Sequence, residues 1–364
     1  HADFVSGARE LAERTGARLY LSGEGDETWK YAYAPAYDAV LLKDGDTFDV
    51  GNVKVRAIHT PGHTPEHLSF AVTDGAASTD QPIGVFTGDF VFVNDVGRPD
   101  LLEKAAKVLG TMEAGARTLF HSIQRFKREL PDFVQIWPGH GAGSACGKAL
   151  GAVPQSTLGY EKLVNWGLLL EDEAEFVEAV LAGQPEPPAY FAEMKRINKE
   201  GPRLLGRMPS PRRLSDARLG AILDSGGLVI DTRHPAEFAT RHVPGTLNIP
   251  LNASFTTWAG WLIPYNRDFH LILDDKCGHC VEEAVRDLAM IGLDRISGYF
   301  GTEAIDVWAG QSRPLESVPQ TTSGELAERL RDGSAQVLDV RGRTEWEMGH
   351  LPGVGTIDGN SGLH

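Results

Sequence analysis

The stretch Thr60-Pro61-Gly62-His63 decides which fold we expect for this 364-residue sequence, because its proline and glycine pin a turn that aims the histidine inward. Two further segments have the same design: Thr87-Gly88-Asp89 and Pro138-Gly139-His140-Gly141. Histidine and carboxylate side chains are the usual protein ligands of first-row metals. Any one of these residues alone would more often be structural, but the segments in this order predict a metal site.

The first four residues form another such segment. His1-Ala2-Asp3-Phe4 matches the second half of the metal-binding pattern H-x-H-x-D-H, with Phe4 in the position of the last histidine. A phenyl ring has no ligand atom, so a second metal position would lack one ligand, and we expect one metal rather than two. The first histidine of the pattern would lie two residues before His1. We therefore expect further residues upstream in the full protein, and the end at His364 raises the same expectation.

Composition narrows the class of protein. Hydrophobic residues make up 41% and charged residues 23%, as in an ordinary soluble globular protein. The net charge of −15 argues against nucleic acid and anionic membrane surfaces as partners, and no apolar run is long enough to span a bilayer. The three cysteines are too few for a disulfide framework, which favours a cytoplasmic protein, and their odd number leaves at least one free thiol.

Hydrophobic periodicity gives the expected elements of the first half, which are a strand at 53–58, a strand at 84–87, a helix at 117–130 and a strand at 134–137. His63, Asp89 and His140 then lie on loops that follow strands, where α/β proteins usually present their chemistry. Helical periodicity resumes at 160–181. A shift in composition at 209–211 marks a domain boundary.

The second half contains an internal repeat with a constant offset of 108 residues. Asp231-Thr232-Arg233 recurs as Asp339-Val340-Arg341, Glu237-Phe238 as Glu345-Trp346, and His242-Val243-Pro244-Gly245 as His350-Leu351-Pro352-Gly353. An apolar strand precedes each copy. A period this long indicates duplicated domains and not a solenoid of short repeats.

The metal-site segments, combined with the sequences at 94–100 and 141–148, resemble the persulfide dioxygenase branch of the metallo-β-lactamase superfamily over about residues 1–205. The resemblance implies an αββα sandwich and one iron(II) per chain, with zinc as a substitute. Two of the three iron ligands of that family map onto His63 and Asp89, and the third would precede His1. Two histidines and one carboxylate on one face leave open positions for O₂ and a substrate sulfur.

The remaining polar residues of the site have different roles under different metals. With one iron, His1, Asp3 and His140 would orient ligands or substrate without binding the metal. In a zinc hydrolase, the same three residues would help to form a second metal position. Phe4 argues against the hydrolase.

Two further residues are candidates for contact with the substrate. Arg98 is predicted to clamp a carboxylate of a glutathione-like substrate, and the alternative is an ion pair with Asp95 or Asp100. Cys146 lies a few residues past His140 and is a candidate catalytic thiol that accepts or presents a persulfide sulfur. The alternative is a buried, inert cysteine.

The repeated pattern D-x-R, E-[FW], H-x-P-G resembles the rhodanese (sulfurtransferase) domain, an α/β fold with a parallel sheet. These residues are structural in rhodaneses, and the catalytic cysteine lies in a later loop, where backbone amides at a helix start stabilise the persulfide. Here the pattern puts Asp275 at that position, with Cys277 and Cys280 out of register, so we expect an inactive domain. A lone C-x-x-C motif can be redox-active or bind metal, but two ordinary loop thiols are the favoured interpretation.

Together these patterns predict a metallo-β-lactamase domain at 1–208, an inactive rhodanese-like domain at 209–316 and the incomplete start of a second rhodanese domain at 317–364. The expected function is the oxidation of a small thiol persulfide by O₂ to sulfite or a related sulfur oxyanion. The alternatives are a glyoxalase II-like zinc thioester hydrolase and a non-catalytic sulfur-binding scaffold. The resemblance also favours a homo-oligomer. The sequence does not distinguish which thiol carries the persulfide, or sulfite from thiosulfate as the product.

Overall fold

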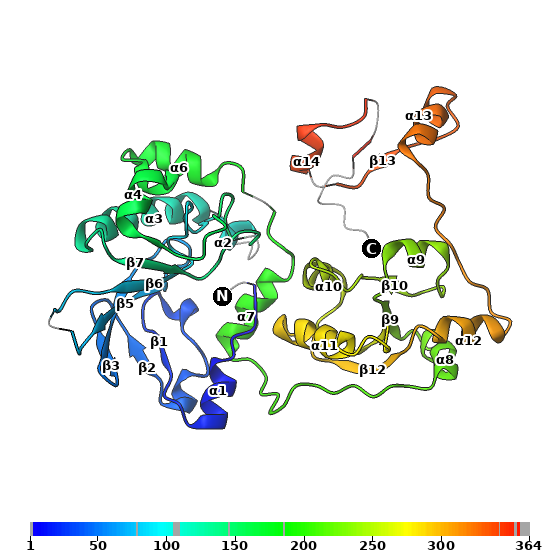
Figure 1. Ribbon diagram of the computed structural model, residues 1–364, viewed down its shortest axis with the longest axis horizontal. Helices are drawn as coiled ribbons and strands as arrows, with labels where there is room; N and C mark the ends of the chain where they lie inside the picture. The colour runs from blue at the N-terminus through cyan, green and yellow to red at the C-terminus, as the bar shows by residue number, and fades with distance from the viewer. Residues whose placement is uncertain are drawn as a thin grey trace. The chain divides into compact units, whose positions relative to one another are not determined.

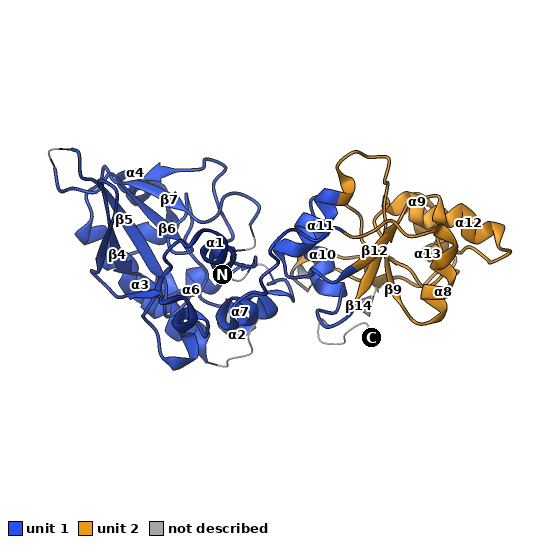
Figure 2. Cartoon of the chain, turned by 90° about the horizontal axis from the view of Figure 1, so that it is seen from below, with its two compact units in different colours: residues 1–210, 253–267, 282–296 blue, residues 211–252, 268–281, 297–364 orange. Residues whose placement is uncertain are grey.

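The structure is a computed structural model that describes residues 3–77, 79–104, 110–144, 146–184, 186–341, 343–352 and 355–356. His1 lies outside the described residues. The chain forms two compact units (Figures 1 and 2): residues 1–210, 253–267 and 282–296 make the first, and residues 211–252, 268–281 and 297–364 make the second. The domain boundaries expected after residues 208 and 316 stay predictions.

A six-stranded sheet with the strand order β3-β4-β5-β6-β7-β8 forms the centre of the first unit. Its strands are β3 (Thr47–Val50), β4 (Val53–His59), β5 (Leu68–Asp74), β6 (Gly84–Gly88), β7 (Gln135–Pro138) and β8 (Ser156–Thr157). Neighbours pair antiparallel except β6 and β7, which are parallel. The strands predicted at 53–58, 84–87 and 134–137 are confirmed as β4, β6 and β7. A separate parallel pair consists of β1 (Tyr20–Ser22) and β2 (Val40–Leu42).

Helix α3 (Thr111–Glu129) covers the six-stranded sheet and confirms the helix predicted at 117–130, although it begins earlier, after Gly110 in a left-handed conformation. Its buried residues Ala116, Leu119, Ile123 and Phe126 are three or four positions apart, so they form one stripe. That stripe packs in a single core with side chains of β4 to β7. The other helices of this part are α1 (Ala8–Thr15), η1 (Glu27–Trp29), η2 (Ala34–Tyr37), α2 (Leu101–Lys104) and α7 (Phe191–Glu200).

The helical segment predicted at 160–181 consists of three helices: α4 (Leu158–Val164), α5 (Trp166–Leu169) and α6 (Glu173–Leu181). Periodicity alone does not reveal the two breaks. They fall at Asn165 and Asp172, whose side chains accept hydrogen bonds from the backbone amides of Gly167 and Glu175 and so start new helices.

A four-stranded sheet with the order β10-β9-β11-β12 forms the second half of the chain, and β10, β9 and β11 are parallel, as predicted. Its elements are η3 (Asp216–Arg218), α8 (Leu219–Asp224), β9 (Leu228–Asp231), α9 (Pro235–Thr240), β10 (Leu247–Asn248), α10 (Phe255–Leu262), β11 (Phe269–Ile272), α11 (Cys280–Met290), β12 (Ile296–Phe300) and α12 (Ala304–Gly310). A buried cluster that includes Val229, Ile272, Phe300 and Trp308 forms a core there.

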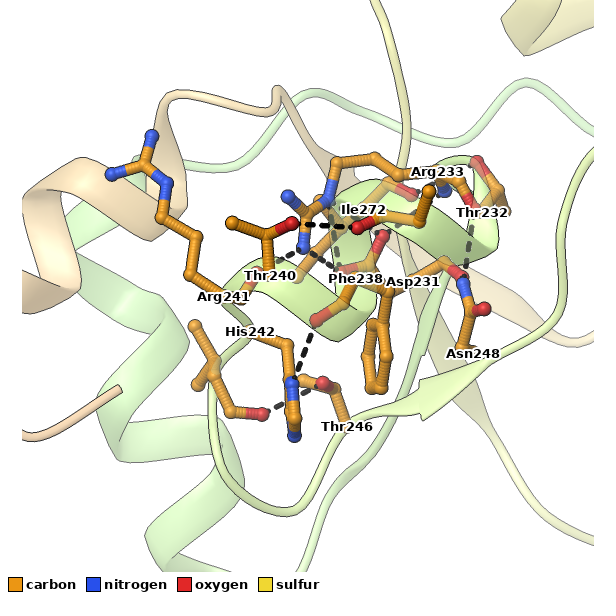
Figure 3. Close-up of polar contacts among 12 residues, drawn as sticks. Asp231, Thr232, Arg233, Phe238, Thr240, Arg241, His242, Thr246, Asn248 and Ile272 are labelled. Atoms are coloured by element: carbon orange, nitrogen blue, oxygen red, sulfur yellow. Dashed lines mark hydrogen bonds and ion pairs between the residues drawn. The ribbon is translucent and has the colours of Figure 1, made fainter. Parts of the chain in front are cut away.

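The first copy of the repeat makes a compact hydrogen-bonded corner at the end of β9 (Figure 3). The Arg233 guanidinium donates to both carboxylate oxygens of Asp231, with Nη2–Oδ2 at 2.7 Å, and also to the carbonyl of Arg241 at 3.0 Å. His242 Nδ1 donates to the carbonyl of Phe238 at 2.9 Å, and the two rings stack at 3.9 Å. These residues therefore stabilise the fold, as the resemblance to the rhodanese domain implies.

The second copy repeats these contacts. Arg341 donates to both oxygens of Asp339 and to the carbonyl of Gly349, and His350 Nδ1 donates to the carbonyl of Trp346, on whose ring it stacks at 3.7 Å. The elements of this part are α13 (Ser323–Arg331), β13 (Leu338–Asp339), α14 (Arg343–Met348) and β14 (Gly355–Thr356). The sequence repeat is thus a repeat of local structure.

The two copies allow a matched test of how burial strengthens this ion pair. Asp231→Ala breaks a pair whose side chains are 0% and 9% exposed, so we expect a loss of about 3–5 kcal/mol in the free energy of unfolding, measured by urea denaturation. Asp339→Ala removes the same contacts where the arginine is 45% exposed, and we expect a smaller loss. Equal losses would contradict the dependence on burial.

Candidate metal site

Asp89 is set by a glycine turn at the end of β6. Gly88 has φ +53°, and a Cβ there would lie 2.8 Å from Nε2 of His67, so only glycine fits. The Asp89 backbone amide donates to His67 Nε2 at 3.1 Å, and Gly139 N donates to the carbonyl of Gly88 at 2.8 Å. The turn therefore ties the Asp89 loop to the loops that carry His67 and His140.

His67 is a positioning residue that sequence reasoning did not single out. Because its Nε2 accepts a hydrogen bond from a backbone amide, its Nδ1 carries the hydrogen and donates to Thr60 Oγ1 at 2.8 Å. Thr60 Oγ1 in turn contacts Ser69 Oγ at 2.9 Å, and both hydroxyl residues are buried. The Thr60 to His67 spacing within one short loop was the available signal.

His63 presents a ring nitrogen to Asp89. Its Nδ1 lies 2.9 Å from the carbonyl of Arg98, and since a carbonyl can only accept, Nδ1 carries the hydrogen and the Nε2 lone pair is left for a metal. Nε2 is 3.5 Å from Asp89 Oδ2. Gly62 has φ +144°, and a Cβ there would lie 2.5 Å from the side chain of Leu119, so α3 packs directly on the turn that aims His63.

His140 and Asp3 lie on the other side of the same carboxylate. His140 Nε2 is 2.9 Å from Asp89 Oδ1 and 3.4 Å from Asp3 Oδ2. Asn198, on α7, donates to the carbonyl of Phe4 and accepts from Ser6 N, which fixes the segment that carries Asp3. The structure therefore brings together four predicted residues: Asp3, His63, Asp89 and His140.

Cys146 lies beside His140 and is buried, 1% exposed. Ligand atoms of Asp3, His140 and Cys146 lie within 4.8 Å of one another. Burial opposes the charged form of His140, but hydrogen bonds to Asp89 and Cys146 raise its pKa to about 10. Burial also raises the pKa of the Cys146 thiol above its usual value, although His140 acts in the opposite direction. The surroundings of Cys146 therefore favour the neutral thiol over the thiolate.

Arg98 is not placed to clamp a substrate. Its side chain is fully buried, and its guanidinium donates to both oxygens of Asp100, at 2.8 and 2.7 Å. Burial disfavours the Asp100 carboxylate, but the hydrogen bonds from Arg98 lower its pKa below the usual value. Arg98 therefore forms an internal ion pair with Asp100, which was the alternative to the predicted substrate clamp. Its effect on the site comes through the backbone, because the Arg98 carbonyl orients His63.

A further buried carboxylate, Asp95, joins two loops of the site. Its Oδ2 accepts from the backbone amides of Lys148 and Ala149 at 2.8 and 2.7 Å, and its Oδ1 accepts from Trp166 Nε1 at 2.9 Å. Asp95 is fully buried. The hydrogen bonds of Asp95 therefore connect the loop beyond Asp89 to the loop that contains Cys146.

A pocket of about 300 Å³ opens next to His63 and Asp89. Its wall includes aromatic and charged side chains of β1, η1, the loop after η1 and α7, among them Trp29, Tyr31 and Lys195. Lys195 Nζ lies 3.9 Å over the Trp29 ring, and burial lowers the pKa of this lysine.

The pocket also contains a carboxylate. Glu66 lines it, and burial raises the pKa of this group above its usual value. Desolvation likewise raises the pKa of the Tyr31 hydroxyl. Sequence patterns did not predict this pocket, because its residues come from segments far apart in the chain.

The loop after β11 carries the remaining predicted residues. Asp275 accepts from Arg213 Nε at 2.5 Å, so a carboxylate in an ion pair occupies the position where the rhodanese pattern puts its cysteine. Cys277 and Cys280 form a disulfide. The interpretation of these residues as two ordinary loop thiols is therefore wrong, because the three-residue spacing brings the sulfurs within bonding distance at the start of α11.

Comparison with known proteins agrees with this architecture. Residues 1–140 match the metallo-beta-lactamase superfamily and residues 215–301 the rhodanese-like domain. The crystal structure of a metallo-beta-lactamase from Staphylococcus aureus is 44% identical, with a TM-score of 0.74 over 83% of this chain and 82% of that chain.

Two curated relatives are hydrolases by name. A probable polyketide biosynthesis zinc-dependent hydrolase of Bacillus velezensis is 27% identical over 161 residues, 44% of this chain and 62% of its own length. A hydroxyacylglutathione hydrolase of Rhodopseudomonas palustris is 28% identical over 201 residues, 54% and 64% of the two chains. The chain spans 62%, 46% and 57% of the length of three curated relatives.

The chain therefore belongs to the metallo-β-lactamase superfamily, and its second half contains a rhodanese-like domain, which confirms the predicted fold class. This fold implies a bound metal, zinc or iron. Within the described ranges, none of the helices combines the length and the hydropathy that a bilayer span requires.

The internal role of Arg98 can be tested against the substrate clamp. Arg98→Met and Asp100→Asn each break a fully buried pair, so we expect each to reduce the free energy of unfolding by about 3–5 kcal/mol. The double variant should lose less unfolding free energy than the sum of the two single losses, because the two side chains are coupled. If the variants were instead as stable as the parent in urea denaturation and had a raised KM for substrate, Arg98 would be a substrate-binding residue.

Proposed function

We propose that the first domain oxidises a low-molecular-weight thiol persulfide with O₂ at one iron(II), with sulfite or a related sulfur oxyanion as the product. For sulfite the reaction balances as RSSH + O₂ + H₂O → RSH + H₂SO₃. The observation that carries the proposal is the donor set at the pocket: His63 Nε2 and the Asp89 carboxylate face one point, while Phe4 stands where a second metal would need a histidine.

The residues present fit an iron site. His63 has its Nε2 lone pair directed to Asp89, and both side chains are 5% exposed. A metal with two histidines and one carboxylate keeps open positions. When bound, iron(II) supplies the one-electron chemistry by which O₂ reacts with a closed-shell sulfur compound.

The protein's own groups bind and orient the substrate. The pocket beside His63 and Asp89 holds the thiol carrier, and Lys195 offers a cation to a carboxylate such as those of glutathione. Glu66 is placed to accept from an ammonium group in the same pocket. His140 Nε2 lies 2.9 Å from Asp89 Oδ1, and this ion pair holds the carboxylate in position.

A zinc thioester hydrolase is the second candidate, and one observation favours it. Asp3, His140 and Cys146 bring three potential ligand atoms within 4.8 Å of one another next to Asp89, which could form a second metal position despite Phe4. Relatives named as a zinc-dependent hydrolase and a hydroxyacylglutathione hydrolase are 27% and 28% identical to this chain over the matched residues. A non-catalytic sulfur-binding scaffold is the third candidate.

The remaining parts of the proposal concern the rest of the chain. The rhodanese-like region passes sulfane sulfur between a carrier and the oxidation site, without catalysis at Asp275. The protein is proposed to be a cytoplasmic homo-oligomer without nucleic acid or membrane partners.

Metal content and oxygen uptake test the proposal. Full-length protein loaded with iron(II) should contain one iron per chain and consume O₂ with glutathione persulfide. His63→Ala and Asp89→Asn should each lower this rate by more than about 100-fold, beyond the usual effect of an outer contact. His121→Ala, whose side chain is 67% exposed on α3, is the matched control and should behave as the parent. Two zinc ions per chain with thioester hydrolysis would overturn the proposal.

The pocket makes a separate prediction about affinity. Lys195→Met removes a charged hydrogen-bond donor, so we expect the KM for glutathione persulfide to rise by about tenfold or more while kcat stays near the parent value. Lys43→Met, at an exposed position, is the control. A fall in kcat with unchanged KM would show that Lys195 does not bind the carrier.

A further inference from the structure

The loop between β11 and α11 carries a chemical group that the proposed oxidation does not use. Cys277 and Cys280 are joined in a disulfide, with both residues partly exposed and the intervening Gly278 and His279 exposed. The loop follows the carboxyl end of β11, a strand that pairs in parallel with β9. Loops at the carboxyl ends of parallel strands are where α/β proteins present reactive groups.

The two sulfurs have different surroundings. The ring nitrogens of His279 lie 3.6 and 3.8 Å from Cys277 Sγ. Cys280 is the first residue of α11, an eleven-residue helix, and its backbone amide points back to the carbonyl of Cys277 at 3.4 Å. A helix start stabilises a thiolate, so Cys280 is the better leaving group when the disulfide opens.

The charged neighbours within the loop are paired. Asp275 is held by Arg213, and Lys276 Nζ contacts Glu303 at 2.5 Å. These ion pairs fix the two residues just before Cys277 and leave the disulfide partly exposed to solvent. A small thiol can therefore reach it without movement of the core.

We propose that Cys277 and Cys280 form a redox-active pair that exchanges two electrons with low-molecular-weight thiols. A thiolate RS⁻ attacks Cys277 Sγ, the Cys277–Cys280 bond breaks, and its electron pair leaves on Cys280 Sγ. A second RS⁻ attacks the R sulfur of the mixed disulfide and releases Cys277 as a thiolate beside His279. The two protons of the small thiols end on the two cysteines, so the sum is disulfide + 2 RSH → dithiol + RSSR.

This site is independent of the proposed iron chemistry. While the two cysteines are joined in the disulfide, they cannot bind a metal. Cys277, His279 and Cys280 also place three potential metal ligands together, but the disulfide occupies two of them. Exchange with thiols and binding of zinc are therefore competing outcomes for the same loop.

The test is a redox titration of the full-length protein without added metal. The protein is equilibrated in glutathione buffers of varied reduced-to-oxidised ratio, quenched with an alkylating reagent, and analysed by peptide mass spectrometry. We expect Cys277 and Cys280 to change together, from no alkylation to two, within the range of these buffers. Cys280→Ser should accumulate a mixed disulfide of Cys277 with glutathione, because the resolving thiol is gone.

His279 has its own readout in the same titration. His279→Asn should slow reduction by glutathione about threefold, the effect of a leaving thiol that is about tenfold less acidic. His234→Asn is the matched control, since His234 is an exposed histidine that caps α9 and asparagine is also a good cap.

Three results would overturn the proposal. The two cysteines could be alkylated at every buffer ratio, which would mean that no disulfide forms. The disulfide could persist at every ratio, which would make it structural. Stoichiometric zinc retained through Cys277 and Cys280 would make the loop a metal site. None of these outcomes bears on oxygen uptake at the other domain.

Discussion

The buried carboxylate of Asp89 is the constraint on which the site depends. One oxygen lies 3.5 Å from His63 Nε2 and the other 2.9 Å from His140 Nε2, so a single group lies between both rings. A carboxylate with 4% exposure is costly unless it is paired, and here the turn at Gly88 and the hydrogen bond from the Asp89 backbone amide to His67 hold it beside its partner His140. A metal at His63 would complete the same compensation.

Features that depend on interactions between residues close in sequence could be predicted, and features that depend on distant residues could not. His63 and Asp89 could be predicted because glycine turns after strands fix their direction within a few residues. The β strands were predictable for the same reason, since their apolar runs are continuous. Arg98 was assigned to a substrate because its actual partner depends on burial, and nothing in the sequence distinguishes an exposed arginine from one that packs fully inside with Asp100.

Longer-range features were beyond the sequence patterns. Lys195 and Trp29 meet in the pocket from segments more than a hundred residues apart, and no periodicity relates them. The Cys277–Cys280 disulfide needed the loop geometry, because the same spacing also suits two free thiols or a metal. The repeat was visible in sequence and its two ion pairs have the same geometry, yet only the structure shows that burial separates them, with Arg233 at 9% and Arg341 at 45% exposure.

In the proposed site His63 and Asp89 hold one metal, while Asp3, His140 and Cys146 stay unligated. Anomalous diffraction at the iron edge, from crystals of the iron-loaded full-length protein, tests it most directly. We expect a single peak per chain, bonded to His63 Nε2 and the Asp89 carboxylate, with His140 Nε2 still paired with Asp89. A second peak between Asp3, His140 and Cys146, or a single peak at that position, would contradict it.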